Sequence, residues 1–312
     1  MNVRRPLIID TDPGVDDAIA ILMLLGHPSV DPLAITAVGG NVGLQNTVRN
    51  ALCLVELANR ADVPVCAGAA SPLIAPLHTA EDVHGASGLA HVLLPEPATR
   101  PTEEDASDLI WRLAHEQPGE VTVLALGPLT NIAKAFLRYP ELPKLLRELI
   151  IMGGAILGGN ATLQAEFNIF VDPEAARIVF RSGVKLSMVP LDVCSKTTLS
   201  LSDCDTIEAV GSNAALVAGQ LVRYIYNLAT TRFHHAGAPV YDAIAAALLL
   251  KPSLFTLEQF NVEIELRGVH TRGRTVVDYY GFTKKPANCA IPVLCDKEGY
   301  LQLLCDCVGA LP

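Results

Sequence analysis

Four aspartates lie within eight residues near the start of the chain, namely Asp10, Asp12, Asp16 and Asp17. Carboxylates this close repel one another unless something neutralises their charge. A hard cation that takes oxygen ligands, Ca²⁺ or Mg²⁺, would do so. No sulfur or imidazole is near them in the sequence to favour zinc or copper. The spacing therefore predicts a divalent-cation site.

Helix capping is an alternative explanation for part of this cluster. Asp12 would then be an N-cap, Pro13 the first helical residue and Asp16 a first-turn acid that faces the helix dipole. This explanation accounts for one or two of the acids. It leaves Asp10 and Asp17 unexplained.

A second polar group occupies residues 158–168. Asn160, Glu166 and Asn168 offer hydrogen-bond donors and acceptors around the ring of Phe167. Such a set suits a sugar, whose hydroxyls need polar partners and whose apolar face can lie against an aromatic ring. Because asparagine and glycine are common in loops, an ordinary loop is an equally open interpretation. Beyond this group, Asp172 followed by Pro173 predicts a helix N-cap.

Apolar strand-like segments alternate with helical patterns over the first two thirds of the chain. PLIID precedes VDDAIAILMLLG, LAITAVGG precedes LQNTVRNALCLVELANR, and VTVLALG precedes PLTNIAKAFLRY. The pattern continues through LRELIIMGG, DPEAARIVFRSG and VKLSMVPLD. Near-continuous apolar strands separated by helices predict an open, mostly parallel, doubly wound α/β sheet of the Rossmann-like type.

The last third of the chain has a different pattern. It predicts a long helical region over 202–230, a second helix over 241–251 and a terminal helix over 297–308. Between the last two, FNVEIEL, RTVVDYY and ANCAIPVLCD have the pattern of antiparallel strands. With no linker or internal repeat in view, we expect residues 1–312 to form a single domain.

Several polar or carbonyl-bearing positions follow predicted strands directly. Asp10 and Asp12 follow the first strand, Asn41 the second, and Leu126 and Met152 end two later ones. Ligands of open α/β sheets bind at the carboxyl ends of the strands. We therefore expect these residues to converge on one edge of the sheet.

Charge and hydropathy exclude two classes of partner. The net charge of −10 and the absence of a Lys/Arg run argue against nucleic acid. Mean hydropathy is +0.35, but apolar runs such as 18–25 are far shorter than the roughly 20 residues that a membrane-spanning helix needs. We expect no membrane segment, no signal peptide, reduced cysteines and a cytoplasmic location.

Motifs spread over nearly the whole chain resemble those of the inosine–uridine preferring nucleoside hydrolases. They are DTDPGVDDA, VGGN, VHGASG, GPLTNIA, IMGG, GNAT, AEFNIFVDPEAA and the segment Tyr241-Asp242-Ala243. The similarity is weakest over about 200–237. The resemblance implies an enzyme that hydrolyses the N-glycosidic bond of ribonucleosides to free base and ribose.

The resemblance also implies roles for the acidic residues. Asp12, Asp17, Asp242 and the backbone carbonyl of Leu126 would bind one Ca²⁺, which would carry the nucleophilic water. Asp12 would be the general base, and Asp10 would orient it.

Ribose would be bound by further residues around these acids. Cleavage builds positive charge on the ribose ring in an oxocarbenium-like transition state, which a carboxylate-rich pocket should stabilise. The ribose-binding positions are Asp16, Asn41, Met152, Asn160, Glu166 and Asn168, with Phe167 available to the sugar face.

One position departs from the family pattern. Many members carry a histidine immediately before the late aspartate ligand, where it can protonate the departing base, and here that position is Tyr241. Tyr241 is a poorer acid than histidine, and His84 in VHGASG is the other candidate. His234 and His235, with Tyr226 and Arg232, lie in the divergent segment that covers the base in relatives.

Two other functions remain open from the residues alone. In a phosphatase of the haloacid dehalogenase type, Asp10 would be a covalent nucleophile and Asp12 the acid, although Asp16 and Asp17 would then have no role. A protein that binds nucleosides without cleaving them would account for Tyr241. We favour the active enzyme, and because relatives are dimers or tetramers we expect a homodimer or homotetramer.

Overall fold

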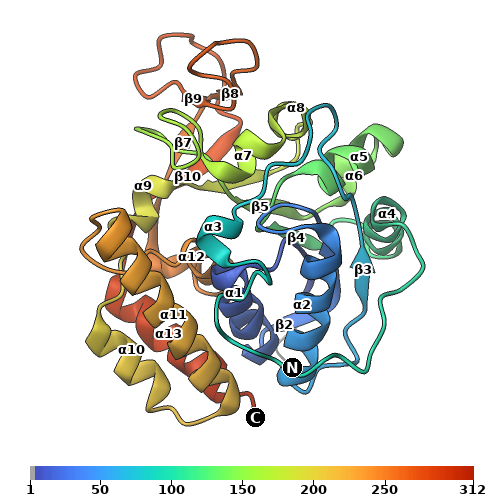
Figure 1. The fold of residues 1–312 in the computed structure, drawn as a ribbon. Coiled ribbons are helices and arrows are strands. Elements are labelled where there is room, and N and C mark those ends of the chain that lie inside the picture. Colours follow the sequence, from blue (N-terminus) through green and yellow to red (C-terminus); the bar gives the residue numbers. More distant parts are fainter. Residues whose placement is uncertain (1–3) are drawn as a thin grey trace.

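The computed structural model describes residues 4–312, whose strands form one large and one small sheet (Figure 1). The large sheet has eight strands in the order β3-β2-β1-β4-β5-β6-β10-β7. Its strands are β1 (Arg5–Thr11), β2 (Val30–Ala37), β3 (Val65–Ala67), β4 (Thr122–Ala125), β5 (Glu148–Met152), β6 (Leu186–Val189), β7 (Phe255–Phe260) and β10 (Cys289–Cys295). All neighbouring pairs are parallel except β10 with β7. The predicted mostly parallel α/β fold is confirmed.

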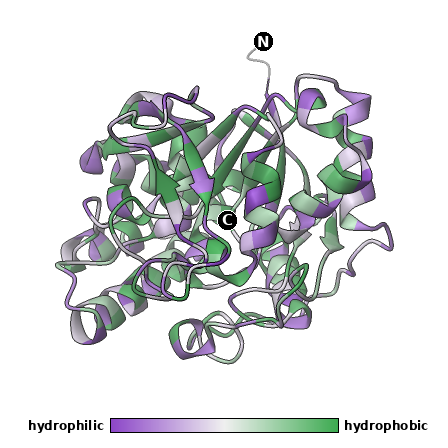
Figure 2. Ribbon diagram, turned by 90° about the horizontal axis from the view of Figure 1, so that it is seen from above, coloured by the Kyte–Doolittle hydropathy of each residue, from purple (hydrophilic) through white to green (hydrophobic). Residues whose placement is uncertain are grey.

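Helices cover both faces of this sheet and bury two separate hydrophobic cores, with the apolar strands between them (Figure 2). Leu7 and Ile9 belong to one core and Ile8 to the other, as the two-residue period of a strand requires. The first core contains α1 (Val15–Gly26), α2 (Leu44–Leu57), α11 (Asn213–Arg232), α12 (Tyr241–Leu250) and α13 (Lys297–Gly309). The second contains α4 (Ala106–Glu116), α5 (Thr130–Arg138) and α8 (Pro173–Phe180). The shorter helices are α3 (Glu81–His84), α6 (Leu142–Leu145), α7 (Phe167–Val171), α9 (Leu191–Cys194) and α10 (Leu201–Glu208), with a 3₁₀ turn at Pro252–Leu254.

Two helices, α1 and α12, are buried over almost their whole length. In α1 every residue from Val15 to Leu25 is buried, and in α12 every residue from Asp242 to Leu249. A helix that is apolar on all sides is stable only inside a protein, and these two pack against each other. Among residues 4–312, no helix is both long and apolar enough to cross a membrane.

The region 202–230, predicted as one long helical stretch, is divided into α10 and α11. Gly211 lies between them with φ +87°, a conformation that favours glycine. The Ser212 hydroxyl then accepts a hydrogen bond from the Ala215 amide (3.0 Å) and caps α11.

The late strands do not form one antiparallel set. Only β8 (Val262–Ile264) and β9 (Thr275–Val277) make a separate antiparallel pair. Strand β10 joins the large sheet, antiparallel to β7 but parallel to β6. Most of β7 lies before the segment predicted from the sequence. Its exposed residues 256–259 lack the apolar alternation that identifies a strand.

Asp172 confirms the predicted N-cap of α8. Its carboxylate accepts a hydrogen bond from the Ala175 amide (3.0 Å), and Pro173 begins the helix. The same buried carboxylate also accepts from the Leu73 amide (2.8 Å) and the Thr130 hydroxyl (2.7 Å). One side chain therefore joins the long loop after β3 to α5 and α8.

We predict that Asp172→Ala lowers the free energy of unfolding by about 3 kcal/mol, because two buried donors and one half-buried donor lose their acceptor. The matched control is Asp296→Ala at the exposed N-cap of α13, where the carboxylate accepts from the Gly299 amide alone among residues 4–312. That control should cost about 1 kcal/mol. Urea unfolding of both variants measures the difference, and equal losses would contradict the buried role of Asp172.

Candidate active site

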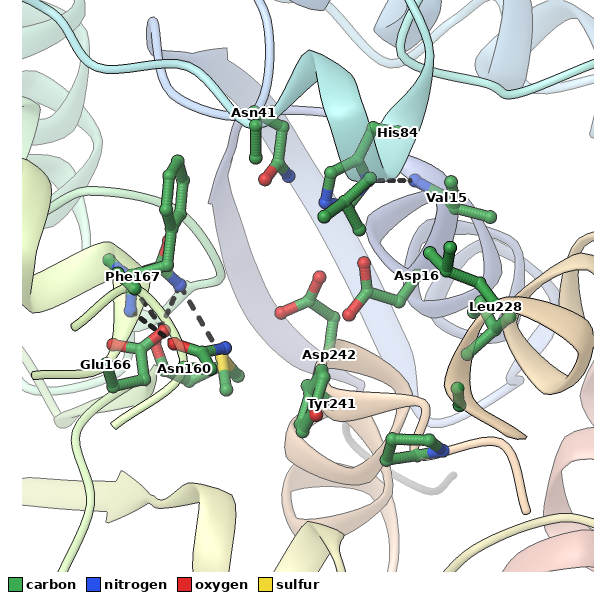
Figure 3. A pocket seen from close by; sticks show the side chains of 18 of the residues that line it. Val15, Asp16, Asn41, His84, Asn160, Glu166, Phe167, Leu228, Tyr241 and Asp242 are labelled. Atoms are coloured by element: carbon green, nitrogen blue, oxygen red, sulfur yellow. Dashed lines mark hydrogen bonds between the residues drawn. The ribbon is translucent and has the colours of Figure 1, made fainter. Parts of the chain in front are cut away.

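A cavity of about 370 Å³ opens at the carboxyl ends of β1, β4 and β5. Its wall comes from the first turns of α1 and α12, the loop after β2, α3, the loop before α7, and α11 (Figure 3). It lies beside β1 and β4, where the strand order reverses, as expected for an open α/β sheet. Asn41, Leu126 and Met152 line this cavity together, as expected, whereas Asp10 and Asp12 do not line it; Asp12 lies beside it, where it accepts a hydrogen bond from the Asn41 amide.

Carboxylates meet on one side of this cavity. One oxygen from each of Asp16, Asp17 and Asp242 lies within 4.8 Å of the others, and all three side chains are buried. Asp16 and Asp242 point toward each other in the cavity (Figure 3). Burial and the charge of Asp17 raise the pKa of Asp16 to about 7. Burial, followed by the charges of Asp16, Asp17 and Asp12, raises the pKa of Asp242 well above its usual value.

Asp12 is adjacent to this group but fully buried. Its pKa is raised by burial and then by the charges of Asp17 and Asp16. Its Oδ2 accepts a hydrogen bond from the Asn41 amide (2.6 Å). A Cβ on Gly40 would lie 2.0 Å from Oδ2, and one on Gly127 would lie 2.5 Å from Oδ1. Only glycine at these two positions leaves room for the Asp12 carboxylate.

Asp17 is held by three hydrogen bonds. Its Oδ1 accepts from the Thr11 hydroxyl (2.6 Å), and its Oδ2 accepts from the Gly14 amide (3.0 Å) and the Asn41 side chain (2.9 Å). Helix α1 begins at Val15 with Gly14 as N-cap, so the alternative in which Asp12 caps the helix and Pro13 begins it is wrong. The carboxylates instead lie at the N-termini of two buried helices, whose dipoles favour negative charge.

The donor set fits a hard divalent cation. Asp12 Oδ1 and Asp242 Oδ1 are buried and have no hydrogen-bond partner among residues 4–312. A buried carboxylate oxygen without a partner is costly, and a cation beside it would remove that cost. All candidate ligands carry oxygen, which suits Ca²⁺ or Mg²⁺.

Asp10 is also buried, but it points to other partners. Its Oδ1 accepts from the Thr36 hydroxyl (2.5 Å) and from the Asn131 side chain (2.8 Å). Burial raises the pKa of Asp10 to about 7. Neither Thr36 nor Asn131 was predicted as a site residue, although Asn131 lies in the GPLTNIA motif.

The polar group predicted to suit a sugar lines the opposite wall of the cavity (Figure 3). Glu166 caps α7 by accepting from the Asn168 amide (2.9 Å), and burial raises its pKa to about 7. The Asn168 side chain donates to the carbonyls of Leu126 (2.7 Å) and Met152 (3.1 Å). Asn160 Oδ1 accepts from the Phe167 amide (2.9 Å).

A third wall carries His84, Tyr241 and the apolar face of α11. His84 Nδ1 accepts from the Val15 amide (3.0 Å), and burial lowers its pKa to about 4, so the imidazole is neutral. Its Nε2 therefore carries the proton. Burial also raises the pKa of the Tyr241 hydroxyl.

Most of this third wall was not identified from the sequence. The residues that line it from α11 and the following loop are Tyr224, Ile225, Leu228, Ala229, Phe233 and His235. Of the four residues named earlier in this segment, only His235 lines the cavity. Arg232 instead forms an ion pair with Asp82 (2.5 Å), beside α3.

Comparison with known proteins agrees with this geometry. The family described as "Inosine-uridine preferring nucleoside hydrolase" matches residues 7–302. A protein of Escherichia coli (strain SMS-3-5 / SECEC), named pyrimidine-specific ribonucleoside hydrolase RihA, is 41% identical over 96% of this chain and 97% of its own length.

Two solved structures are also similar. A plant nucleoside hydrolase, PpNRh1, superposes with a TM-score of 0.91 at 31% identity, covering 97% of this chain and 98% of its own. A purine-preferring ribonucleoside hydrolase of Gardnerella vaginalis superposes with a TM-score of 0.91 at 30% identity, covering 98% of both chains. The chain therefore belongs to the inosine–uridine preferring nucleoside hydrolase family and is a hydrolase that acts on N-glycosyl bonds.

Proposed function

We propose that this enzyme hydrolyses ribonucleosides to base and ribose in the cavity between Asp16, Glu166 and Tyr241. The observation that carries the proposal is the placement of buried carboxylates opposite a polar wall within one cavity of about 370 Å³. That volume holds a ligand the size of a nucleoside. Asp16, Asn41, Asn160, Glu166 and Asn168 would bind the ribose hydroxyls, with Met152 and Phe167 against the sugar.

The cation in this proposal is Ca²⁺, with Asp12, Asp17, Asp242 and the Leu126 carbonyl as its protein ligands. The oxygen-only donor set and the unpartnered oxygens of Asp12 and Asp242 support this assignment. When bound, the ion would lower the pKa of a coordinated water. Asp16, which belongs to the same carboxylate group, faces the cavity and would bind ribose.

Asp12 is the proposed general base. Its carboxylate lies beside the group that would hold the ion, and its Oδ1 has no partner among residues 4–312. The Asn41 amide donates to Oδ2 (2.6 Å) and so fixes the orientation of this carboxylate. Asp10 would help to orient Asp12. The Asp10 carboxylate is itself held by hydrogen bonds from the Thr36 hydroxyl and the Asn131 side chain.

The surrounding carboxylates would favour the transition state over the substrate. As the glycosidic bond lengthens, positive charge develops on the ribose ring between Asp16 and Glu166. Both groups are held before the reaction, Glu166 by backbone amides, so little reorganisation is needed when the charge appears.

Tyr241 and His84 are the proposed donors to the departing base. The Tyr241 hydroxyl is protonated at neutral pH and can donate a hydrogen bond as negative charge builds on the base, although burial raises its pKa and so weakens it as an acid. His84 presents Nε2–H because Val15 occupies Nδ1. The two groups line the same cavity.

Pyrimidine ribonucleosides are the proposed preferred substrates, because the relatives that are 41% identical over nearly the whole chain are named pyrimidine-specific.

We further propose one nucleoside hydrolase domain over 1–312, a cytoplasmic location and a homodimer or homotetramer. Large exposed hydrophobic side chains support the assembly, among them Leu93, Val269, Tyr280 and Phe282. Eight free cysteines support a reducing compartment.

Ribose release from a panel of purine and pyrimidine ribonucleosides tests the activity, before and after calcium is stripped. We expect calcium-dependent release that is fastest with pyrimidines, and loss of release in a folded Asp12→Asn variant. Faster purine cleavage would overturn the base preference alone. Release that is unaffected by stripping would overturn the role of the ion, and substantial release by Asp12→Asn would exclude Asp12 as the base.

Tyr241→Phe separates base protonation from the rest of the reaction. We expect it to slow cleavage of natural ribonucleosides by roughly a hundredfold, because general acid catalysis contributes on that order. Cleavage of p-nitrophenyl riboside should change little, because this leaving group departs without a proton. Initial rates on both substrates give the comparison, and equal losses would show that Tyr241 is not the acid.

A further inference from the structure

The turn over residues 153–157 connects β5 to the wall that carries Glu166. It begins with Gly153 and Gly154, the end of the IMGG motif. Gly154 has φ +75°, and a Cβ there would lie 2.7 Å from the Thr275 side chain, so only glycine fits. The Gly154 amide donates to Glu166 Oε2 (2.9 Å). The turn therefore supplies one of the backbone amides that hold the Glu166 carboxylate in place.

Thr275 in β9 holds this turn from one side. Its hydroxyl donates to the Ala155 carbonyl (2.6 Å) and accepts from the Ala155 amide (2.9 Å). The side chain is 2% exposed, so the two backbone groups of Ala155 have no ready replacement by water. A single hydroxyl thus satisfies both polar groups of one turn residue.

Asp192 in α9 holds the same turn from another element. Its Oδ2 accepts from the Ile156 amide (2.7 Å), and its Oδ1 accepts from the Leu157 amide (3.1 Å). Three consecutive residues of the turn are therefore fixed by two side chains. These side chains belong to elements that contribute no lining residue to the cavity within the described chain.

The fixed turn connects directly to the rest of the polar wall. Glu166 Oε2 also accepts from the Ile169 amide (3.1 Å), and Oε1 accepts from the Asn168 amide (2.9 Å). The Asn168 side chain in turn donates to the Leu126 carbonyl (2.7 Å). Gly273 lies two residues before the start of β9, and its backbone is so close to Phe170 that an added Cβ would lie 3.1 Å from the Phe170 Cα. The loop between β8 and β9 thus contacts α7, and Thr275 of β9 contacts the turn.

We propose that Thr275 and Asp192 are positioning residues for ribose binding, and that the small β8–β9 sheet serves to hold the turn 153–157 against Glu166. This inference rests on the proposed role of Glu166 as a ribose ligand. It gives a function to a sheet that is separate from the large one (Figure 1) and contributes none of the described residues that line the cavity. Neither residue touches the substrate in this proposal, and both act through the backbone of the turn.

The experiment compares kcat and KM for ribonucleoside cleavage in four variants. Thr275→Val keeps the shape and removes both hydrogen bonds, whereas Thr275→Ser keeps the hydroxyl. Val276→Thr changes the next residue of β9, which is 47% exposed, and serves as the matched control. Glu166→Gln tests the ribose contact itself. Unfolding temperatures of all four are measured alongside.

We expect Thr275→Val to raise KM roughly tenfold or more with a smaller change in kcat, because the ribose ligand is displaced. Thr275→Ser should restore KM to within about twofold, and Val276→Thr should match the unchanged enzyme. If Thr275→Val keeps the original KM while Glu166→Gln raises KM, the inference is overturned. The proposed role of Glu166 in ribose binding then stays intact. An unchanged KM in Glu166→Gln would instead overturn that role.

Asp192→Asn provides a second test if Thr275→Val does not fold. The variant keeps one acceptor for the turn and loses the other. A raised KM with normal folding supports the inference. An unchanged KM in a folded Asp192→Asn enzyme overturns it.

Discussion

Mutual repulsion among buried carboxylates is the constraint on which this structure depends. Asp12, Asp16, Asp17 and Asp242 lie in or beside one cluster, and burial together with their own charges raises the pKa of three of them. A fold stabilised only by apolar contacts would not keep such a group inside. Two features of the molecule reduce the cost. The acids lie at the N-termini of α1 and α12, and their oxygens accept hydrogen bonds from Thr11, Gly14 and Asn41.

Apolar packing and two glycines bring the acids together against this repulsion. Helices α1 and α12 are apolar on all sides and bury each other, which brings acids more than 200 residues apart in sequence to one place. Gly40 and Gly127 leave space for the Asp12 carboxylate. The oxygens of Asp12 and Asp242 that remain without partners mark where a cation would complete the site. Substrate charge that develops nearby would experience the same negative field.

Much of this arrangement follows from local sequence patterns. The apolar strands and the DTDPGVDDA segment predict a parallel sheet with acids at its carboxyl edge, because those features depend on neighbouring residues. The division between α10 and α11 was missed although Gly211 and Ser212 form a local stop-and-cap signal. The edge strand β7 was missed because its exposed residues lack apolar alternation.

The contacts made by Asn131, Asp192 and Thr275 were also missed. Each is an ordinary polar residue in its own segment, and its partner lies in a distant part of the chain. The apolar face of α11 presents the same problem, because a buried helix face and a wall of a binding cavity require the same residues. Only the folded chain distinguishes Tyr224 and Leu228 from core residues.

Calcium binding to the stripped protein tests the central claim most directly, with Asp242→Asn as the comparison. Calorimetric titration should give a single ion per chain, and the bound ion should raise the unfolding temperature because it binds only the folded state. Asp242→Asn should lose most of both effects. If the folded, stripped protein binds no calcium but still releases ribose, the claim that a cation neutralises this cluster is contradicted.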